Sequence, residues 1–484
     1  MSKENILQKE LDLALEKFKQ AKYVEAFEDF KLLSKSFNHF LVYWYLGHTA
    51  YRLNEYKLAI RYILKSIDLK SKDAINLNFL GELYRQINKN EEAIDAFNEA
   101  LIIEPNNKSA IVNIASLYSD LGNFDKSLTY LKNLLLIEPL NYYAIYEIAK
   151  LDKTCLTNEL KEKTQELIND NKLNNENLIY ANLILAEFEN KSSKFELEIN
   201  ALIKAHSIFL SLKKKAAEEE YNYFNNLLPK FVAKIKDMEF VSNIQTTPIF
   251  IMGLPRSGTT LVENIINLGS ESIISGEETG VMGKVFFRNQ IIKEYSSQDL
   301  LTDFKFQSKD LNFIKGKIVD QYNEIGINVF EDRFTDKSLE SLLYIDLLHK
   351  IFPNAKFIYC SRDRSANIIG VLKVFLPNLL WTHSIEKILN IFKIYQNKLE
   401  EILLEKKIQI KVIELEKLSN NPEPVTKELF NFLELNWSDK CLQIAENKNK
   451  IIKTVSNKQV RDSIKKHDLS YLANYDFFLK KYNL

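Results

Sequence analysis

A loop bounded by two glycines, residues 253–260, carries the strongest chemical signal in this sequence. It reads Gly-Leu-Pro-Arg-Ser-Gly-Thr-Thr and follows a short apolar run, residues 249–252, that is typical of a buried strand. A helical pattern begins directly after the loop. The backbone amides of such a loop and the N-terminus of the following helix bind phosphate groups. The order of strand, loop and helix therefore predicts an anion site.

The loop has the glycine spacing of a nucleotide-binding P-loop but lacks its lysine. Thr259 occupies the position of the lysine that reaches the β- and γ-phosphates of a nucleoside triphosphate. Arg256, inside the loop, offers instead a planar set of donors that suits an oxyanion. This exchange argues against a nucleotide-dependent kinase, which we keep as an alternative.

Three charged features follow the loop along the chain. Gly276-Glu277-Glu278-Thr279 comes after the first helix, and Thr335-Asp336-Lys337 is expected to open a helix that extends to residue 351. A second buried strand then begins at residue 355 and ends in Arg362. A lone Glu-Glu pair or a lone lysine is usually solvated surface. Their order between two anion-binding motifs favours one shared site.

The run Pro-Arg-Ser-Gly-Thr-Thr-Leu after a buried strand resembles the 5′-phosphosulfate loop of sulfotransferases, which use 3′-phosphoadenylyl sulfate (PAPS). The resemblance implies that Arg362 grips the 3′-phosphate and that Lys337 contacts the oxygen that bridges phosphate and sulfonate. The residues that the resemblance assigns to the 5′-phosphosulfate are Arg256, Ser257, Gly258, Thr259, Thr260 and Leu261.

Two glutamates compete for the role of general base. Gly-Glu-Glu-Thr resembles protein-tyrosine sulfotransferases, in which the second glutamate is the base, and this match implies Glu278. The spacing from the loop is one residue longer than in those enzymes and closer to bacterial repeat-containing sulfotransferases, and that register implies Glu277. A base of this kind typically contributes ~10²–10⁴-fold in rate. Donors at Arg256 and Lys337 would stabilise charge on the leaving phosphate.

The C-terminal segment extends the resemblance and also departs from it. Residues 408–415 predict a third strand, and the segment with Thr454 and Gln459 resembles one that covers the nucleotide in bacterial members. There Arg461 is our candidate for a further phosphate contact, with Lys465 and Lys466 as weaker ones; an exposed helix explains these charges equally well. Gly370 stands where the family has a serine that assists the 3′-phosphate, a contact that Ser365 could replace. Arg364 stands where proline or glycine is usual.

The N-terminal segment repeats with a period of 34 residues. Gly81, Ala93, Phe97 and Pro105 recur in kind one period later, at Ala115, Ser127, Leu131 and Pro139, and the match is less complete one period earlier. Small residues suit close helix crossings, and the proline ends the second helix of a pair. The pattern resembles the tetratricopeptide repeat, with a degenerate first copy at Ala26 and Phe30. Such an array serves as a spacer, a dimerisation platform or a groove for a peptide.

Together these features predict a multidomain chain. We expect a tetratricopeptide-repeat solenoid at residues 1–145, further helices that cap it at 146–240, and an α/β, P-loop-like sulfotransferase domain with a parallel sheet at 241–484. The expected reaction moves a sulfonate from PAPS to an acceptor hydroxyl. A repeat scaffold with an inactive catalytic domain is the other alternative.

Composition limits the partners. Lys and Arg number 65 and Asp and Glu also number 65, which predicts neither a nucleic-acid partner nor a membrane partner. Three separated cysteines and the lack of an apolar leader indicate a reducing, cytoplasmic location. The histidines show no ligand spacing, so no metal is expected. The acceptor is a peptide or protein, with tyrosine as one candidate, or a small hydroxylated molecule, and a homodimer is left open.

Overall fold

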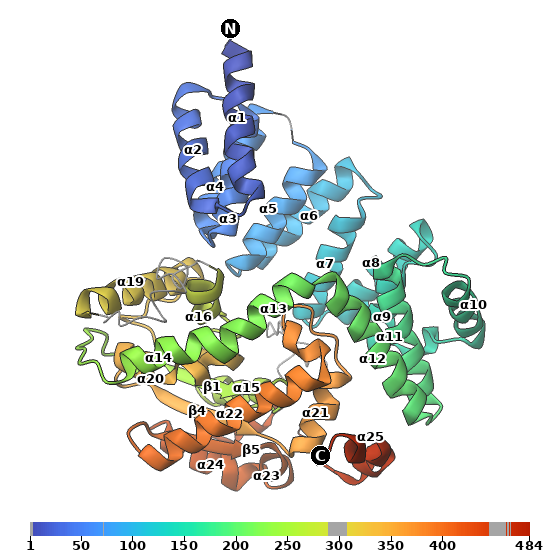
Figure 1. Cartoon of the computed structure of the whole chain (residues 1–484), viewed down its shortest axis with the longest axis vertical. Coiled ribbons are helices and arrows are strands. Elements are labelled where there is room, and N and C mark those ends of the chain that lie inside the picture. The colour runs from blue at the N-terminus through green and yellow to red at the C-terminus, as the bar shows by residue number, and fades with distance from the viewer. Residues whose placement is uncertain (1–2, 71, 289–306, 445–460, 462–463, 465) are drawn as a thin grey trace.

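The structure is a computed structural model that describes residues 3–70, 72–288, 307–444, 461, 464 and 466–484. Helix pairs form the N-terminal half and a parallel sheet flanked by helices forms the C-terminal half (Figure 1). Within the described residues no helix has the length and apolar character that crossing a membrane requires.

The repeat pattern folds as the sequence predicts, into antiparallel helix pairs. Gly81 shows why small residues keep the register: a Cβ atom there would lie 2.5 Å from the ring of Phe97 on the partner helix. Ala26 and Phe30 are completely buried, so the degenerate first copy is also a packed pair. The helices of the array are α1 Lys3–Lys19, α2 Tyr23–Ser36, α3 Phe40–Arg52, α4 Tyr56–Leu69, α5 Ala74–Gln86, α6 Asn90–Ile103, α7 Lys108–Asp120, α8 Phe124–Ile137 and α9 Tyr142–Leu151.

The following helices connect the array to the sheet. Helices α11 and α12 pack against each other, and α11 also packs against α9, whereas α13 and α14 cross the face of the C-terminal half (Figure 1). Glu220 on α13 accepts hydrogen bonds from the backbone amides of Leu380 and Trp381. One apolar core therefore runs from α9 through these helices into the sheet domain. Their bounds are α10 Asn158–Asn169, α11 Asn175–Lys191, α12 Phe195–Leu212, α13 Lys214–Asn222 and α14 Leu228–Lys236.

Five strands form a sheet with the order β2-β3-β1-β4-β5, and every described pairing is parallel. The fully buried β1 lies at the centre, and its residue Gly253 pairs with Cys360 at the end of β4. Because parallel strands end at the same edge, the loops after β1, β2, β3 and β4 meet there. The strands are β1 Ile249–Gly253, β2 Ile274–Ser275, β3 Phe334–Asp336, β4 Lys356–Ser361 and β5 Ile410–Glu414.

Helices cover both faces of the sheet. Their bounds, including the 3₁₀ and π segments written η, are α15 Thr259–Gly269, α16 Val281–Gly283, η3 Lys284–Arg288, α19 Ser308–Glu324, η4 Leu339–Tyr344, α20 Ile345–Ile351, α21 Arg364–Leu372, η5 Leu380–His383, α22 Ile385–Glu405, α23 Leu415–Asn420, α24 Pro422–Phe432, η6 Asp439–Leu442, η9 Ser470–Tyr475 and α25 Asp476–Lys481.

One local expectation was wrong. Thr335 and Asp336 do not open a helix: they belong to strand β3, which pairs with both β1 and β2. Lys337 follows the strand directly, and a 3₁₀ turn starts only at Leu339. A strand of three residues is too short for alternation to reveal it, and its partners are distant in the sequence.

Candidate functional site

The loop between β1 and α15 passes through two residues in the left-handed region. Arg256 has φ 69° and Gly258, the N-cap of α15, has φ 93°. An arginine in this region is strained, so surrounding contacts must hold it. Asn367 donates from Nδ2 to the carbonyl of Pro255 at 2.7 Å, and Arg362 donates from Nη1 to the carbonyl of Arg256 at 3.0 Å. The protein's own side chains thus fix the loop.

Arg256 and Arg362 bring two guanidinium groups to this edge of the sheet. Burial, together with the charge of Arg362, lowers the pKa of Arg256 to about 10. Within the described residues, the buried Oγ of Ser257 and the buried Nε of Arg362 have no hydrogen-bond partner. Buried polar atoms normally have a partner, here one that a ligand can supply. This set of donors fits a phosphate-like oxyanion.

The other loop residues lie where the sequence predicts them. Thr259 and Thr260 are buried in the first turn of α15, followed by the partly buried Leu261. The helix N-terminus adds its partial positive charge to that of the two arginines.

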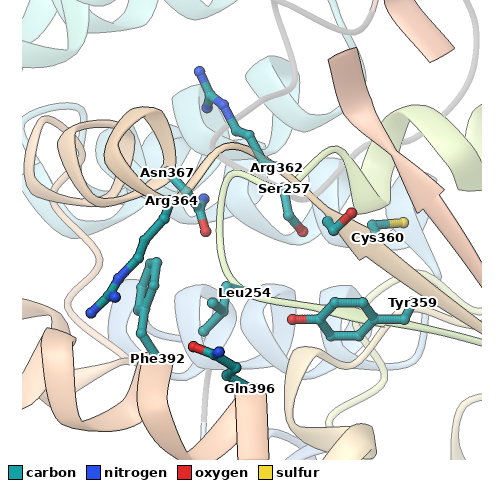
Figure 2. A pocket seen from close by; sticks show the side chains of 10 residues that line it. Leu254, Ser257, Tyr359, Cys360, Arg362, Arg364, Asn367, Phe392 and Gln396 are labelled. Carbon is teal, nitrogen blue, oxygen red and sulfur yellow. The ribbon is translucent and has the colours of Figure 1, made fainter. Parts of the chain in front are cut away.

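A cavity of about 140 Å³ adjoins the loop (Figure 2). Ser257 and Asn367 lie near its centre, Arg362 points away from Phe392, and Arg364 extends toward it (Figure 2). Arg364, which stands where proline or glycine is usual, therefore places a positive charge on the opposite side of the cavity from Arg362.

Gly370, which stands where the family has a serine, lies against Arg256 and Arg362. A Cβ atom at this position would be 3.1 Å from Nη1 of Arg362 and 3.5 Å from Cβ of Arg256. A serine at position 370 would therefore place its hydroxyl beside these two arginines.

The Gly-Glu-Glu-Thr loop follows β2 and is held against β3. Gly276 donates its N–H to the carbonyl of Thr335 at 3.0 Å, and a Cβ atom on Gly276 would lie 2.1 Å from that oxygen. Lys337 in turn donates its backbone N–H to the carbonyl of Glu277 at 2.9 Å. Glu277 has φ 59°, in the left-handed region, and the side chain that follows it, Glu278, is 45% exposed. Only glycine fits at position 276 because the two strands approach so closely.

Glu263 on α15 supports this loop and was not identified from the sequence. Its side chain is completely buried, and Oε1 accepts hydrogen bonds from the backbone N–H of Glu277 at 3.1 Å and from Oγ1 of Thr335 at 2.7 Å. The signal was present: an acidic residue on an otherwise apolar helix face needs buried partners. Asn367 is a second functional residue that sequence analysis missed.

Lys337 is completely buried, with its ammonium group between acidic side chains. Its Nζ lies 3.0 Å from Oε1 of Glu278 and 3.9 Å from Oε2 of Glu277. Burial by itself would lower the pKa of Lys337, but the carboxylates of Glu278, Glu277 and Glu263 outweigh it, so the net shift is upward. Lys337 is therefore a fixed positive charge at the end of β3.

The two candidate bases differ in exposure. The side chain of Glu278 is 45% exposed, whereas that of Glu277 is 11% exposed. Both line a cavity of about 540 Å³. An acceptor that enters this cavity can thus reach Glu278 beside the lysine.

Arg461 lies at the repeat array, against Gly122. Its Nη2 donates to the carbonyl of Asp120 at 3.0 Å, and Glu277 is among the acidic groups that act on its charge. Its predicted phosphate contact remains a prediction. Three residues of the predicted covering segment lie outside the described residues: Thr454, Gln459 and Lys465. The structure does describe Lys466, which is exposed. In the described ranges, no three His, Cys, Asp or Glu side chains form a cluster that could hold a metal ion.

Comparison with known proteins matches each half of the chain to a family. Residues 248–439 match the sulfotransferase family, and residues 42–73, 75–107 and 109–139 match the tetratricopeptide repeat. The chain is 25% identical over 354 residues to an uncharacterised protein of Aquifex aeolicus, a match that covers 67% of this chain and 43% of that protein. It is 28% identical over 225 residues to protein-tyrosine sulfotransferase 1 of Danio rerio, covering 43% of this chain and 58% of that enzyme.

Both matches span less than two thirds of the relative's own length. A solved sulfotransferase domain from the curacin biosynthetic pathway aligns with 45% of this chain and 83% of that domain, with 18% identity and a TM-score of 0.30.

Proposed function

We propose that this chain, which carries a sulfotransferase-family domain behind tetratricopeptide repeats, transfers a sulfonate group from PAPS to an acceptor hydroxyl, with tyrosine in a polypeptide as the leading candidate. One observation supports the proposal most: the loop of Arg256, which Arg362 holds, and the Lys337–Glu278 pair lie at the same edge of one parallel sheet. The site thus combines donors for an anion with a base beside them.

The donor side of the site would be formed by Arg256, Arg362 and the first turn of α15. When bound there, PAPS supplies a sulfonate activated by its anhydride link to phosphate. The two guanidinium groups and the buried Oγ of Ser257 fit its phosphate oxygens. Because Arg362 and Asn367 already hold the loop, little reorganisation accompanies binding.

On the acceptor side, Glu278 is our general base. It is the more exposed of the two glutamates, and it lines the larger cavity. It accepts the proton of the acceptor hydroxyl as the oxygen attacks sulfur, while Lys337 stabilises the negative charge that develops on the leaving phosphate.

Calorimetric titration with adenosine 3′,5′-bisphosphate, with and without Mg²⁺, tests the proposal. We expect tight binding that does not require the metal. A kinase would instead bind ATP and require Mg²⁺, and an inactive scaffold would not bind the bisphosphate. A chain that fails to bind the bisphosphate without metal would contradict the proposed function.

A further inference from the structure

The helix-to-helix turns of the repeat array share one geometry. The residues Asn54, Asn88 and Gly122 follow one another at intervals of 34 residues, and their φ values are 61°, 61° and 76°. Each turn joins the two helices of one repeat. Equivalent turns of a solenoid lie along one edge, and here that edge faces the sheet domain (Figure 1).

The first and third turns contact the C-terminal half. After the first turn, Lys57 donates its backbone N–H to Oε2 of Glu324 at 2.9 Å, at the end of α19. At the third turn, the guanidinium of Arg461 lies against Gly122 and donates to the carbonyl of Asp120. The array is therefore held on both sides of its second turn.

The second turn forms a wall of the cavity that contains the candidate bases. The cavity of about 540 Å³ that Glu277 and Glu278 line is also lined from the array by Arg85, Gln86 and Asn88. The cavity thus has one wall from the catalytic loop and one from the repeats. Without the repeats, the candidate bases would face open solvent on this side.

A polar strip continues from this wall along the array. On α5, Asn78, Glu82 and Arg85 share one face, and they bond to Asn113 and Asp120 on α7. Nδ2 of Asn113 donates to Oδ1 of Asn78 at 3.0 Å and to Oε1 of Glu82 at 2.8 Å. Nη2 of Arg85 donates to Oδ2 of Asp120 at 2.6 Å. Arg85 belongs to both the strip and the cavity, which makes the two surfaces continuous.

We infer that the second turn of the repeat array forms one wall of the acceptor site and contacts the main chain of an extended polypeptide acceptor; this inference rests on the proposed function. Pockets for small molecules are walled mainly by apolar side chains. This wall instead carries amides at Gln86 and Asn88, each with a donor and an acceptor, as a peptide backbone requires. The strip at Asn78 and Asn113 extends this polar surface, with its amides bonded to each other and to Glu82.

The test uses the full chain, radiolabelled PAPS, and two sets of acceptors: short synthetic peptides with a single Tyr, Ser or Thr, and small phenols and alcohols. The variant combines Gln86→Ala with Asn88→Gly, since glycine keeps the left-handed backbone at position 88. We expect label on peptides and a roughly tenfold lower kcat/KM in the variant, mainly through KM, as expected for the loss of about two hydrogen bonds. Its Kd for adenosine 3′,5′-bisphosphate should not change.

Arg52→Ala is the matched control. It stands one repeat before Gln86, is exposed, and does not line the cavity, so its kinetics should equal those of the unaltered chain. Equal kcat/KM for peptides in the Gln86/Asn88 variant would overturn the role of the repeats. Label only on small molecules, or on no acceptor while the bisphosphate still binds, would overturn the polypeptide acceptor. Failure to bind the bisphosphate would contradict the proposed function itself.

Discussion

The Nζ atom of the completely buried Lys337 lies 3.0 Å from Oε1 of Glu278, a side chain that is 45% exposed. One partner faces the protein interior and the other faces the larger cavity. In the proposed reaction this pair would join the donor side of the site, where charge develops on the leaving group, to the acceptor side, where a proton is lost. Removal of either partner should affect transfer more than folding.

Replacement of each glutamate by glutamine separates the candidate bases. Glu278→Gln should lower kcat by about 10²–10⁴-fold, because the amide cannot accept the acceptor's proton. Glu277→Gln should have a smaller effect, since Glu277 is nearly buried and contributes its backbone carbonyl to Lys337. Single-turnover transfer rates measure both. A larger loss in Glu277→Gln would reverse the assignment.

Lys337→Ala and Arg256→Ala should each lower transfer by roughly 10²–10³-fold, as expected for loss of a donor that stabilises developing charge. The far-UV circular dichroism of both variants should match the unaltered chain. Arg364→Ala is the comparison variant, since Arg364 extends to the opposite side of the cavity from Arg362 (Figure 2). Near-normal turnover in either Lys337→Ala or Arg256→Ala would refute the role of that residue.

Gly370 offers a gain-of-function test on the 3′-phosphate side. Gly370→Ser places a hydroxyl beside Arg256 and Arg362 and should tighten binding of adenosine 3′,5′-bisphosphate by about tenfold. Gly370→Ala adds the same Cβ atom without the hydroxyl. Both should stabilise α21 by roughly 0.5–1 kcal/mol relative to glycine, less the cost of the 3.1 Å contact with Arg362. Calorimetry that shows equal tightening in both variants would rule out a hydroxyl contact.

A buried histidine pair predicts a pH dependence of stability. Nδ1 of His206 lies 2.7 Å from Nδ1 of His383, and burial lowers the pKa of His206 to about 4 and that of His383 to about 3. Unfolded histidines titrate near pH 6.5, so between pH 6.5 and about 4 the unfolded state binds more protons. The free energy of unfolding should therefore fall as pH is lowered through this range.

Urea unfolding of the unaltered chain and of His383→Gln at several pH values measures this effect. The variant should lose on the order of 1 kcal/mol less between about pH 7 and about pH 5.5. Burial raises the pKa of the nearby Glu220 to about 7, which gives a contribution of opposite sign. Both proteins share that contribution, so their difference isolates the histidine. Identical pH profiles would contradict the prediction.

Local patterns predicted much of the architecture, and the contacts between distant segments explain the rest. The repeat register was visible because Gly81 must be small against Phe97, a contact made within one repeat. The strands β1 and β4 were visible as continuous apolar runs, since both faces of the sheet are covered. By contrast, β3 depends on hydrogen bonds to β1 and β2, so its sequence alone suggested a helix start.

For the site, too, local motifs were visible in the sequence and contacts between distant segments were not. Motifs predicted the site residues Arg256, Arg362, Glu278 and Lys337, and the structure brings these residues to one edge of the sheet. Sequence analysis missed Glu263 because its role depends on a hydrogen bond to the backbone of Glu277, which lies beyond the rest of α15 and strand β2. The contribution of the repeats to the larger cavity also could not be predicted, because no local pattern specifies how the array curves over the sheet (Figure 1).

The evenly spaced turns of the array limit the gain or loss of repeat units in this chain. Repeat proteins generally tolerate the gain or loss of whole units, because each unit contacts only its neighbours. Here the turns at Lys57 and Gly122 touch the C-terminal half, and the turn between them faces Glu278. Deletion of one unit from this region would leave a stable solenoid whose turns no longer match the sheet domain. The proposed active site therefore constrains the number of units after Lys57.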